Sequence, residues 1–362
     1  MKEAKATQSC DCLSVAFGPQ SGRERKYVVL RQWGGQPIEK VVQNAGHLES
    51  LPFDGVNFTV PASWDLMLAG VSWSYDNLLK SILPIKAAFS RLDQIFVVVH
   101  TRGFPDVFDD WSQVTENFRH LARAAKEVGI TGIMYDNETY KEKGWHYPRE
   151  VRYPERSRGE YQDHMRLRGQ QIMEAVCAEF PDITFVVYFG PYVSEPKTPE
   201  GVILRQSGRD YNDLRGSFFV GIVEGSSAQA TVVDGGKLYQ YRSEQHFERS
   251  YQWRKFGIAS VVTDCPFIPA HVRTQWAEKI SVAFMCYEKQ WLDGYPMDPA
   301  IMRPVLECAI RRTDRYVFFY AESEWVAPGD VTREWLEAVT EGIRQGKQSG
   351  LHPWAWTEWG AM

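Results

Sequence analysis

Apolar and polar positions repeat with two different periods along the chain, and segments with one period alternate with segments that have the other. Short runs rich in β-branched and aromatic residues predict strands, and longer stretches with an apolar position every three or four residues predict helices. The predicted strands are residues 26–33, 54–60, 95–101, 131–137, 183–189, 217–223, 258–264 and 315–321. The predicted helices are residues 111–129, 158–180, 243–257, 272–290 and 332–346. The chain is therefore expected to alternate between strand and helix.

The strands are nearly continuous apolar runs, which is typical of a parallel sheet covered on both faces. A (β/α)8 TIM barrel needs about 250 residues, so a chain of 362 leaves room for long βα loops. A doubly wound open sheet is the alternative, and it would place a glycine-rich phosphate loop after the first strand. The segment found there, WGGQP, does not match that pattern. We expect an N-terminal arm over residues 1–25 and a single barrel domain over residues 26–362.

Composition narrows the class of protein. The formal net charge is -5 and the pI about 6.0, which argues against a nucleic-acid partner. No apolar run reaches the length of a membrane span, and no signal peptide is visible at the start, so we expect a cytoplasmic protein without a membrane partner, although a processed secreted form stays possible. The six cysteines lack metal-binding spacing and are expected to be free thiols, although pairing of Cys10 with Cys12 stays open.

The segment GIMYDNETY, residues 132–140, carries the first candidate chemistry. An apolar run ends abruptly in Asp136, Asn137 and Glu138. Because side chains alternate along a strand, Asp136 and Glu138 are expected to point into the barrel together, with Asn137 pointing away. Two close carboxylates repel, which raises one pKa and lets that group act as a general acid.

Polar side chains also end other predicted strands. Barrel enzymes carry their chemistry at the carboxyl ends of the strands, so these residues are expected to converge on one rim. The polar candidates for substrate contact are Asn57, His100, Glu224, Asp264 and Glu322. Aromatic residues make up 14% of the chain, and aromatic faces in loops are typical platforms for sugar rings. The aromatic candidates are Tyr140, Trp145, Tyr192 and Trp325.

The segment TGIMYDNE resembles the strand-four signature of family-18 chitinases, D-G-x-D-x-D-x-E. Gly132, Asp136 and Glu138 occupy matching positions, whereas Thr131 and Met134 replace the first two aspartates. The resemblance implies a glycoside hydrolase barrel in which Glu138 protonates the glycosidic oxygen. It also implies that Asp136 orients a 2-acetamido group of the substrate, which acts as the nucleophile.

The same letters resemble a second pattern. Asn137-Glu138 is similar to the Asn-Glu pair on strand four of the large retaining clan that includes many cellulases and β-galactosidases. There a second glutamate, at the tip of strand seven, is the nucleophile; here the predicted strand seven ends in Asp264. We therefore expect a glycoside hydrolase with Glu138 as general acid and base, and favour the substrate-assisted form. A two-carboxylate mechanism and a barrel that binds carbohydrate without cleaving it remain as alternatives. The eight histidines lack metal-site spacing, so neither a metal nor a cofactor is expected, and the oligomeric state stays open.

Overall fold

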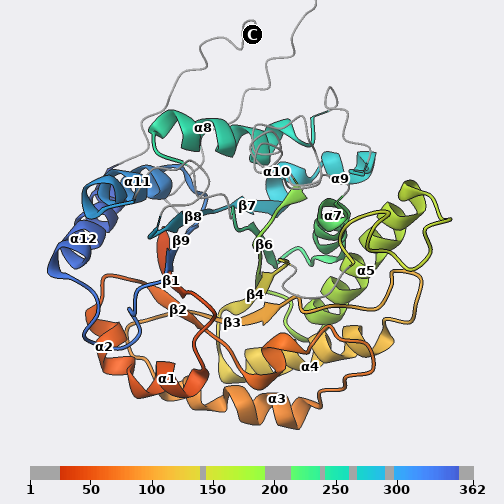
Figure 1. Cartoon of the computed structure of the whole chain (residues 1–362), viewed down its shortest axis with the longest axis horizontal. Coiled ribbons are helices and arrows are strands. Elements are labelled where there is room, and N and C mark those ends of the chain that lie inside the picture. Colours follow the sequence, from red (N-terminus) through yellow and green to blue (C-terminus); the bar gives the residue numbers. More distant parts are fainter. Residues whose placement is uncertain are drawn as a thin grey trace, which may run out of the picture.

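The computed structural model describes residues 25–138, 144–191, 213–236, 241–260, 267–289 and 297–349. Parallel strands form a central ring, and helices surround it (Figure 1). The strands are β1 (Tyr27–Gln32), β2 (Gly55–Phe58), β3 (Gln94–His100), β4 (Gly132–Asp136), β5 (Thr184–Val187), β6 (Thr231–Asp234), β7 (Ile280–Val282), β8 (Phe284–Tyr287) and β9 (Tyr316–Ala321). Of the predicted N-terminal arm, only Arg25 belongs to the described residues.

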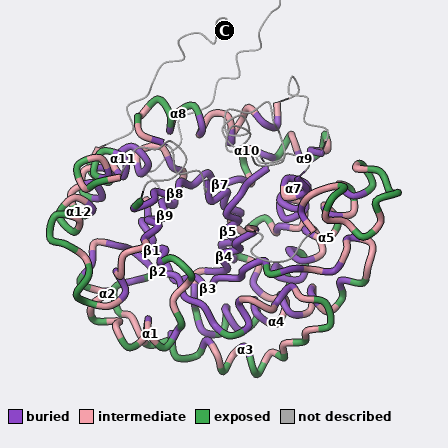
Figure 2. The backbone as a smooth tube through the Cα atoms, in the orientation of Figure 1, coloured by how far each residue is buried: buried purple, intermediate pink, exposed green. Residues whose placement is uncertain are grey.

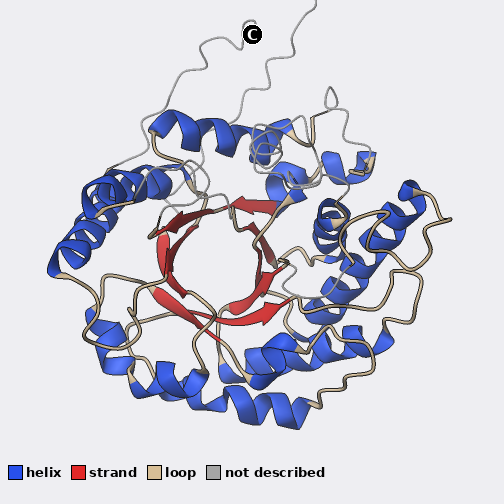
Figure 3. Cartoon of the chain, viewed as in Figure 1, coloured by secondary structure: helices blue, strands red, loops and turns tan. Residues whose placement is uncertain are grey.

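The ring is closed by one strand that is interrupted at a single residue. Only Ala283 separates β7 from β8, and its backbone N–H still bonds to the carbonyl of Asp234. β7 pairs with β6, and β8 pairs with β9, which in turn pairs with β1. Counting β7 and β8 as one strand gives eight positions around the closed ring of Figure 3. The prediction of a (β/α)8 TIM barrel is confirmed.

Helices cover the outside of the ring. They are α1 (Ile38–Gln43), α2 (Ala45–Ser50), α3 (Tyr75–Ile82), α4 (Ser112–Val128), α5 (Arg158–Glu179), α7 (Arg215–Gly225), α8 (Glu244–Gln252), α9 (Ala270–Arg273), α10 (Trp276–Lys279), α11 (Pro299–Arg312) and α12 (Arg333–Gln348). Figure 2 shows the strands buried at the centre, while exposed positions gather on the outer sides of the helices. Within the described ranges, no helix is both long and apolar enough to span a bilayer.

Strand alternation divides the buried side chains into two layers. Met134 belongs to a cluster inside the barrel that also contains Val98 and Phe318. Ile133 and Tyr135, its neighbours on β4, belong to the larger layer between strands and helices. The inward phase of β4 is therefore the phase of Met134 and Asp136, as the sequence predicts.

Three predicted elements are wrong at least in part. Residues 217–223, predicted as a strand, lie in helix α7. Residues 258–260 form a turn rather than a strand, and the rest of the predicted strand 258–264 lies outside the described residues. The predicted helix 272–290 ends with α10, and the chain continues directly into β7 and β8. Strand β6 was not predicted. Strand six of the barrel is therefore β6, and strand seven is β7 with β8.

Candidate active site at the carboxyl rim

Asp136, the last residue of β4, is the centre of a buried charge cluster. Its carboxylate is fully enclosed, and Oδ2 lies 3.1 Å from Nδ1 of His100 at the end of β3. Nη2 of Arg31, on β1, lies 3.9 Å from the same oxygen. Both partners are as buried as the carboxylate itself, with 1% exposure each. A buried carboxylate needs such partners, because an unpaired charge would be costly away from water.

Two tyrosines enclose the Arg31 guanidinium. Nε of Arg31 donates to the hydroxyl of Tyr188, and the guanidinium carbon lies 5.3 Å from the Tyr188 ring and 5.2 Å from the Tyr320 ring. Burial raises the pKa of both phenols, so they are neutral at physiological pH. The cluster therefore brings the Asp136 carboxyl group, the Arg31 guanidinium and His100 together with neutral phenols.

Glu138 lies two residues beyond Asp136 and is half-buried. Its backbone N–H donates to Oδ1 of Asp136 at 3.1 Å. Asn137 between them faces away, because its side chain exchanges two hydrogen bonds of 2.9 Å with the backbone of Phe189. The charges of Asp136, Glu138 and Glu322 all act on Tyr320: burial contributes most to its raised pKa, and these carboxylates raise it further. The charge of Glu138, the second carboxylate of the GIMYDNETY segment, thus reaches Tyr320.

Glu322, directly after β9, supplies another carboxylate at the same rim. The hydroxyl of Tyr287 donates to Oε1, and Nζ of Lys289 lies 2.8 Å from Oε2. Burial favours the neutral acid, but the bonds from Lys289 and Tyr287 outweigh it and lower the pKa of Glu322. Glu322 is therefore ionised at neutral pH.

Two tryptophans border this rim. Trp64 stacks on His100 with ring centroids 3.9 Å apart and planes at 11°. Trp33 follows β1, where its backbone N–H bonds to the Ala321 carbonyl at 2.7 Å, and its side chain is 61% exposed. No pattern in the sequence distinguishes Trp33, since it reads as the end of an apolar strand. Its one local signal is the following pair of glycines, which both have positive φ.

Two aromatic residues predicted to contact substrate are core residues instead. Trp145 is fully buried against Phe104 and Phe218. Trp325 is fully buried against Phe53 and Phe319. Their large apolar rings gain more from burial than from a place in a wet cleft.

Two polar candidates lie elsewhere than the sequence suggests. Asn57 faces the barrel interior, but it is fully buried, and its amide donates to Sδ of Met134 at 3.6 Å, below the rim. Glu224 lies near the end of helix α7, which leads into the amino-terminal end of β6, and it pairs with Arg166 and His271. It is therefore separated from the carboxyl rim. Asp264, Tyr140 and Tyr192 lie outside the described residues.

Strand seven of the barrel ends in a glutamate, Glu288, that sequence reasoning missed. Its carboxylate accepts hydrogen bonds from the backbone N–H groups of Glu322 and Ser323, at 2.7 Å each, and from Nε1 of Trp325 at 3.0 Å. The side chain is only 3% exposed. Glu288 thus fixes the turn after β9, which carries Glu322, rather than facing the barrel mouth.

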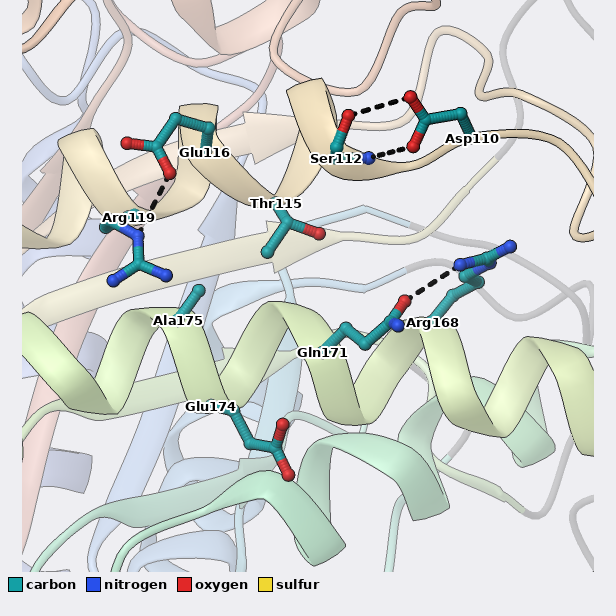
Figure 4. Close-up of a pocket in the computed structure, with 9 residues that line it drawn as sticks. All are labelled: Asp110, Ser112, Thr115, Glu116, Arg119, Arg168, Gln171, Glu174 and Ala175. Atoms are coloured by element: carbon teal, nitrogen blue, oxygen red, sulfur yellow. Dashed lines mark hydrogen bonds and ion pairs between the residues drawn. The ribbon is translucent and has the colours of Figure 1, made fainter.

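No metal cluster among the described residues competes with this rim, and none of the residues that line a groove on the outer surface belongs to the rim. Among the described residues, no group of three or more histidine, cysteine, aspartate or glutamate side chains is arranged to hold a metal ion. A groove of about 480 Å³ lies between α4 and α5 on the outer surface (Figure 4). Some side chains of its polar lining are hydrogen-bonded to one another. Ser112 donates to Asp110, and Arg168 donates to Gln171.

No family model matches the chain, and no curated protein matches it. Solved structures do. An endoglucanase of broad specificity from Clostridium longisporum aligns over 88% of each chain with 9% identity and a TM-score of 0.50. A GH5_18 protein from Streptomyces cattleya, solved in complex with GlcNAc, aligns over 92% of this chain and 83% of its own with 10% identity and a TM-score of 0.49. A 3-keto-D-glucoside 4-epimerase from E. coli aligns over 89% of this chain and all of its own, with 13% identity and a TM-score of 0.43.

Likeness at such identities extends to the fold alone, because one barrel architecture carries many chemistries. The closed ring of parallel strands and the alignment with the endoglucanase agree on that fold. The chain is a (β/α)8 TIM barrel with its candidate site at the carboxyl ends of the strands.

Proposed function

We propose that the protein hydrolyses a glycosidic bond at this rim, with Glu138 as the general acid and base. The observation that carries the proposal is the position of Glu138: half-buried, in the inward phase of β4, and held at its backbone by Asp136. A general acid has to protonate the leaving oxygen from within a partly desolvated site, and an inward carboxyl at a strand tip meets that need.

Glu322 is the second carboxylate of the proposed mechanism. Lys289 and Tyr287 favour its ionised form, which suits a nucleophile or a base rather than an acid. As nucleophile it would form a glycosyl–enzyme bond while Glu138 donates its proton to the leaving oxygen, and water would then be activated by Glu138. As base it would activate water directly, with inversion. The anomer formed first, observed by NMR, distinguishes the two.

Asp136 fits a positioning role better than direct contact with an acetamido group. Its carboxylate is fully buried, and its oxygens are engaged by His100, Arg31 and the Glu138 backbone. The observation favours the two-carboxylate mechanism over the substrate-assisted one. Under this proposal, cleavage does not require a 2-acetamido group on the sugar.

The substrate class is an oligosaccharide. Trp33 offers a largely exposed indole face beside the β9 tip, and Trp64 offers a second aromatic surface above His100. Indole faces pack against the apolar C–H faces of pyranose rings, while the carboxylates and Lys289 can accept and donate hydrogen bonds to hydroxyl groups.

The experiment is a panel of aryl glycosides that includes gluco-, manno-, galacto-, xylo- and N-acetylhexosaminides. We expect the wild type to release the aryl group from at least one of them, and Glu138→Gln to lose most of that activity while keeping its fold. Turnover of a 2-hydroxyl sugar supports the two-carboxylate mechanism, whereas turnover restricted to 2-acetamido sugars would contradict it. A wild type inactive on the entire panel and on the corresponding oligosaccharides would contradict the proposed function.

A further inference from the structure

We propose that Arg215, held by Asp213, is a positioning residue that fixes the direction in which Glu138 leaves the strand-four tip. The inference deepens the proposed function and rests on it for its catalytic consequence. Arg215 is the first residue of α7, so it reaches the tip of β4 from a different part of the chain.

The contact with the strand-four tip is to the backbone. Nε of Arg215 donates to the carbonyl oxygen of Asn137 at 2.6 Å. The N–H of the same peptide group belongs to Glu138 and donates to Oδ1 of Asp136 at 3.1 Å. One peptide plane is therefore held at both ends, by a cation at its oxygen and by a carboxylate at its nitrogen.

Clamping this plane restricts Glu138, because it fixes the direction of the N–Cα bond and leaves φ as the one rotation of the preceding backbone that still redirects the Cα–Cβ bond. The Asn137 side chain adds a further anchor through its two bonds to Phe189. The charges also match the peptide dipole, since a cation faces the carbonyl oxygen and an anion faces the N–H.

Arg215 is itself held in place. Its backbone N–H donates to Oδ1 of Asp213 at 2.7 Å, and its Nη1 pairs with Oδ2 of the same carboxylate. The guanidinium carbon lies 5.5 Å from the Trp145 ring and 5.8 Å from the Phe189 ring. Arg215 and Asp213 have side-chain exposures of only 12% and 3%. The pair is a fixed support, not a mobile surface ion pair.

Trp145 and Leu214 also join two βα loops. The Leu214 N–H donates to the Trp145 carbonyl at 2.8 Å, which ties the segment after β4 to the start of α7. Trp145 was predicted to contact sugar, but its ring is buried against Arg215 instead. It thereby helps to hold the arginine that clamps the tip of β4.

Two variants test the clamp. Arg215→Met keeps the length and apolar contacts of the side chain but removes the donor, and Arg215→Lys keeps the charge but loses the planar fork. A small displacement of a catalytic group costs up to about 10²-fold in rate. We expect Arg215→Met to lower kcat about 10- to 100-fold at nearly unchanged KM, and Arg215→Lys to recover part of the loss.

Arg312→Met is the matched control. Arg312 is also largely buried and pairs with two carboxylates, Glu244 and Glu248, but it lies between the outer helices α8 and α11. We expect it to lower the Tm about as much as Arg215→Met does while leaving kcat unchanged. Equal losses of kcat in the two methionine variants would mean that general destabilisation explains the effect, and would overturn the inference.

Hydrogen exchange at residues 132–138 gives a readout that does not depend on activity. We expect faster exchange of this segment in Arg215→Met than in the wild type and in Arg312→Met, with intermediate exchange in Arg215→Lys. Unchanged exchange would overturn the clamp even in an active enzyme. Faster exchange in a protein that cleaves no glycoside would support the clamp and instead contradict the proposed function. If Arg215→Met does not fold, Arg215→Lys carries both measurements.

Discussion

Oδ2 of Asp136 lies 3.1 Å from Nδ1 of His100, and neither side chain reaches solvent. Arg31 adds a cation 3.9 Å from the same oxygen. Asp136 is therefore a carboxylate shared by this buried cluster and the strand-four tip, since its other oxygen accepts a hydrogen bond from the Glu138 backbone. Under the proposed function, Asp136 contributes both to the stability of the fold and to the position of the general acid. Substitutions can separate these two contributions.

Asp136→Asn is expected to destabilise the protein by about 3–5 kcal/mol, because it removes the carboxylate that faces the buried Arg31 cation. Urea denaturation followed by circular dichroism measures the loss. Glu138→Gln is the matched comparison, since it also exchanges a carboxylate for an amide but at a half-buried position. We expect it to change the free energy of unfolding by less than about 1 kcal/mol. Similar losses in both variants would contradict the assignment of the two roles.

Trp325→Ala and Trp33→Ala are expected to differ sharply in stability. Trp325 is fully buried, so its removal leaves a cavity and should cost about 3–5 kcal/mol. Trp33 is 61% exposed, so its removal should change stability by no more than about 0.5 kcal/mol. Thermal unfolding of both variants measures the difference. A strongly destabilised Trp33→Ala would show that this side chain is part of the core.

Trp33→Ala is also expected to weaken the binding of oligosaccharides about tenfold, or by about 1.4 kcal/mol. Calorimetric titration in the Glu138→Gln background separates binding from turnover, with the oligosaccharide series chosen from the sugar that the aryl panel identifies. Trp33→Phe should retain part of the affinity because it keeps an aromatic face. Affinities equal to those of the parent for every chain length would remove Trp33 from the substrate site.

The acid limb of the pH profile for kcat/KM is expected to reflect Glu322. Its pKa lies below the ordinary value of 4.5, because the bonds from Lys289 and Tyr287 outweigh the opposing effect of burial. Activity that requires ionised Glu322 is therefore present above that range and falls as pH drops through the lowered pKa. Lys289→Met removes a partner of the ionised form, so the acid limb should move to higher pH. An unmoved limb, measured over the range in which both proteins stay folded, would contradict the role of Glu322.

Local alternation made the strand-four tip predictable. The inward phase of Asp136 and the outward phase of Asn137 follow from the period of two along a strand, and the side-chain contacts of these two residues agree with it. The sequence did not predict that Arg31 is a partner of Asp136. Arg31 lies in the middle of an apolar strand 105 positions earlier, and only barrel closure brings it to Asp136.

Two elements, α7 and β7, were not predicted from the sequence because tertiary packing hides their periodicity. Helix α7 is buried on nearly every side, so its sequence SFFVGIV lacks a polar face and resembles a strand. Gly221 allows this burial, since a Cβ there would lie 1.9 Å from the Arg166 carbonyl oxygen on α5. β7 follows α10 without a loop, so its apolar positions read as a continuation of the helix. Miscounting these strands moved the expected tip of strand seven from Glu288 to Asp264.

The most direct test of the central claim compares leaving groups in Glu138→Gln. A general acid matters most when the departing oxygen is strongly basic, so we expect kcat/KM to fall about 10²–10⁴-fold for an alkyl or unsubstituted phenyl glycoside. For the 2,4-dinitrophenyl glycoside of the same sugar, whose leaving group departs without protonation, the loss in bond cleavage should be less than about tenfold. Equal losses for both substrates, or activity close to that of the wild type for both, would contradict the assignment of Glu138 as the general acid.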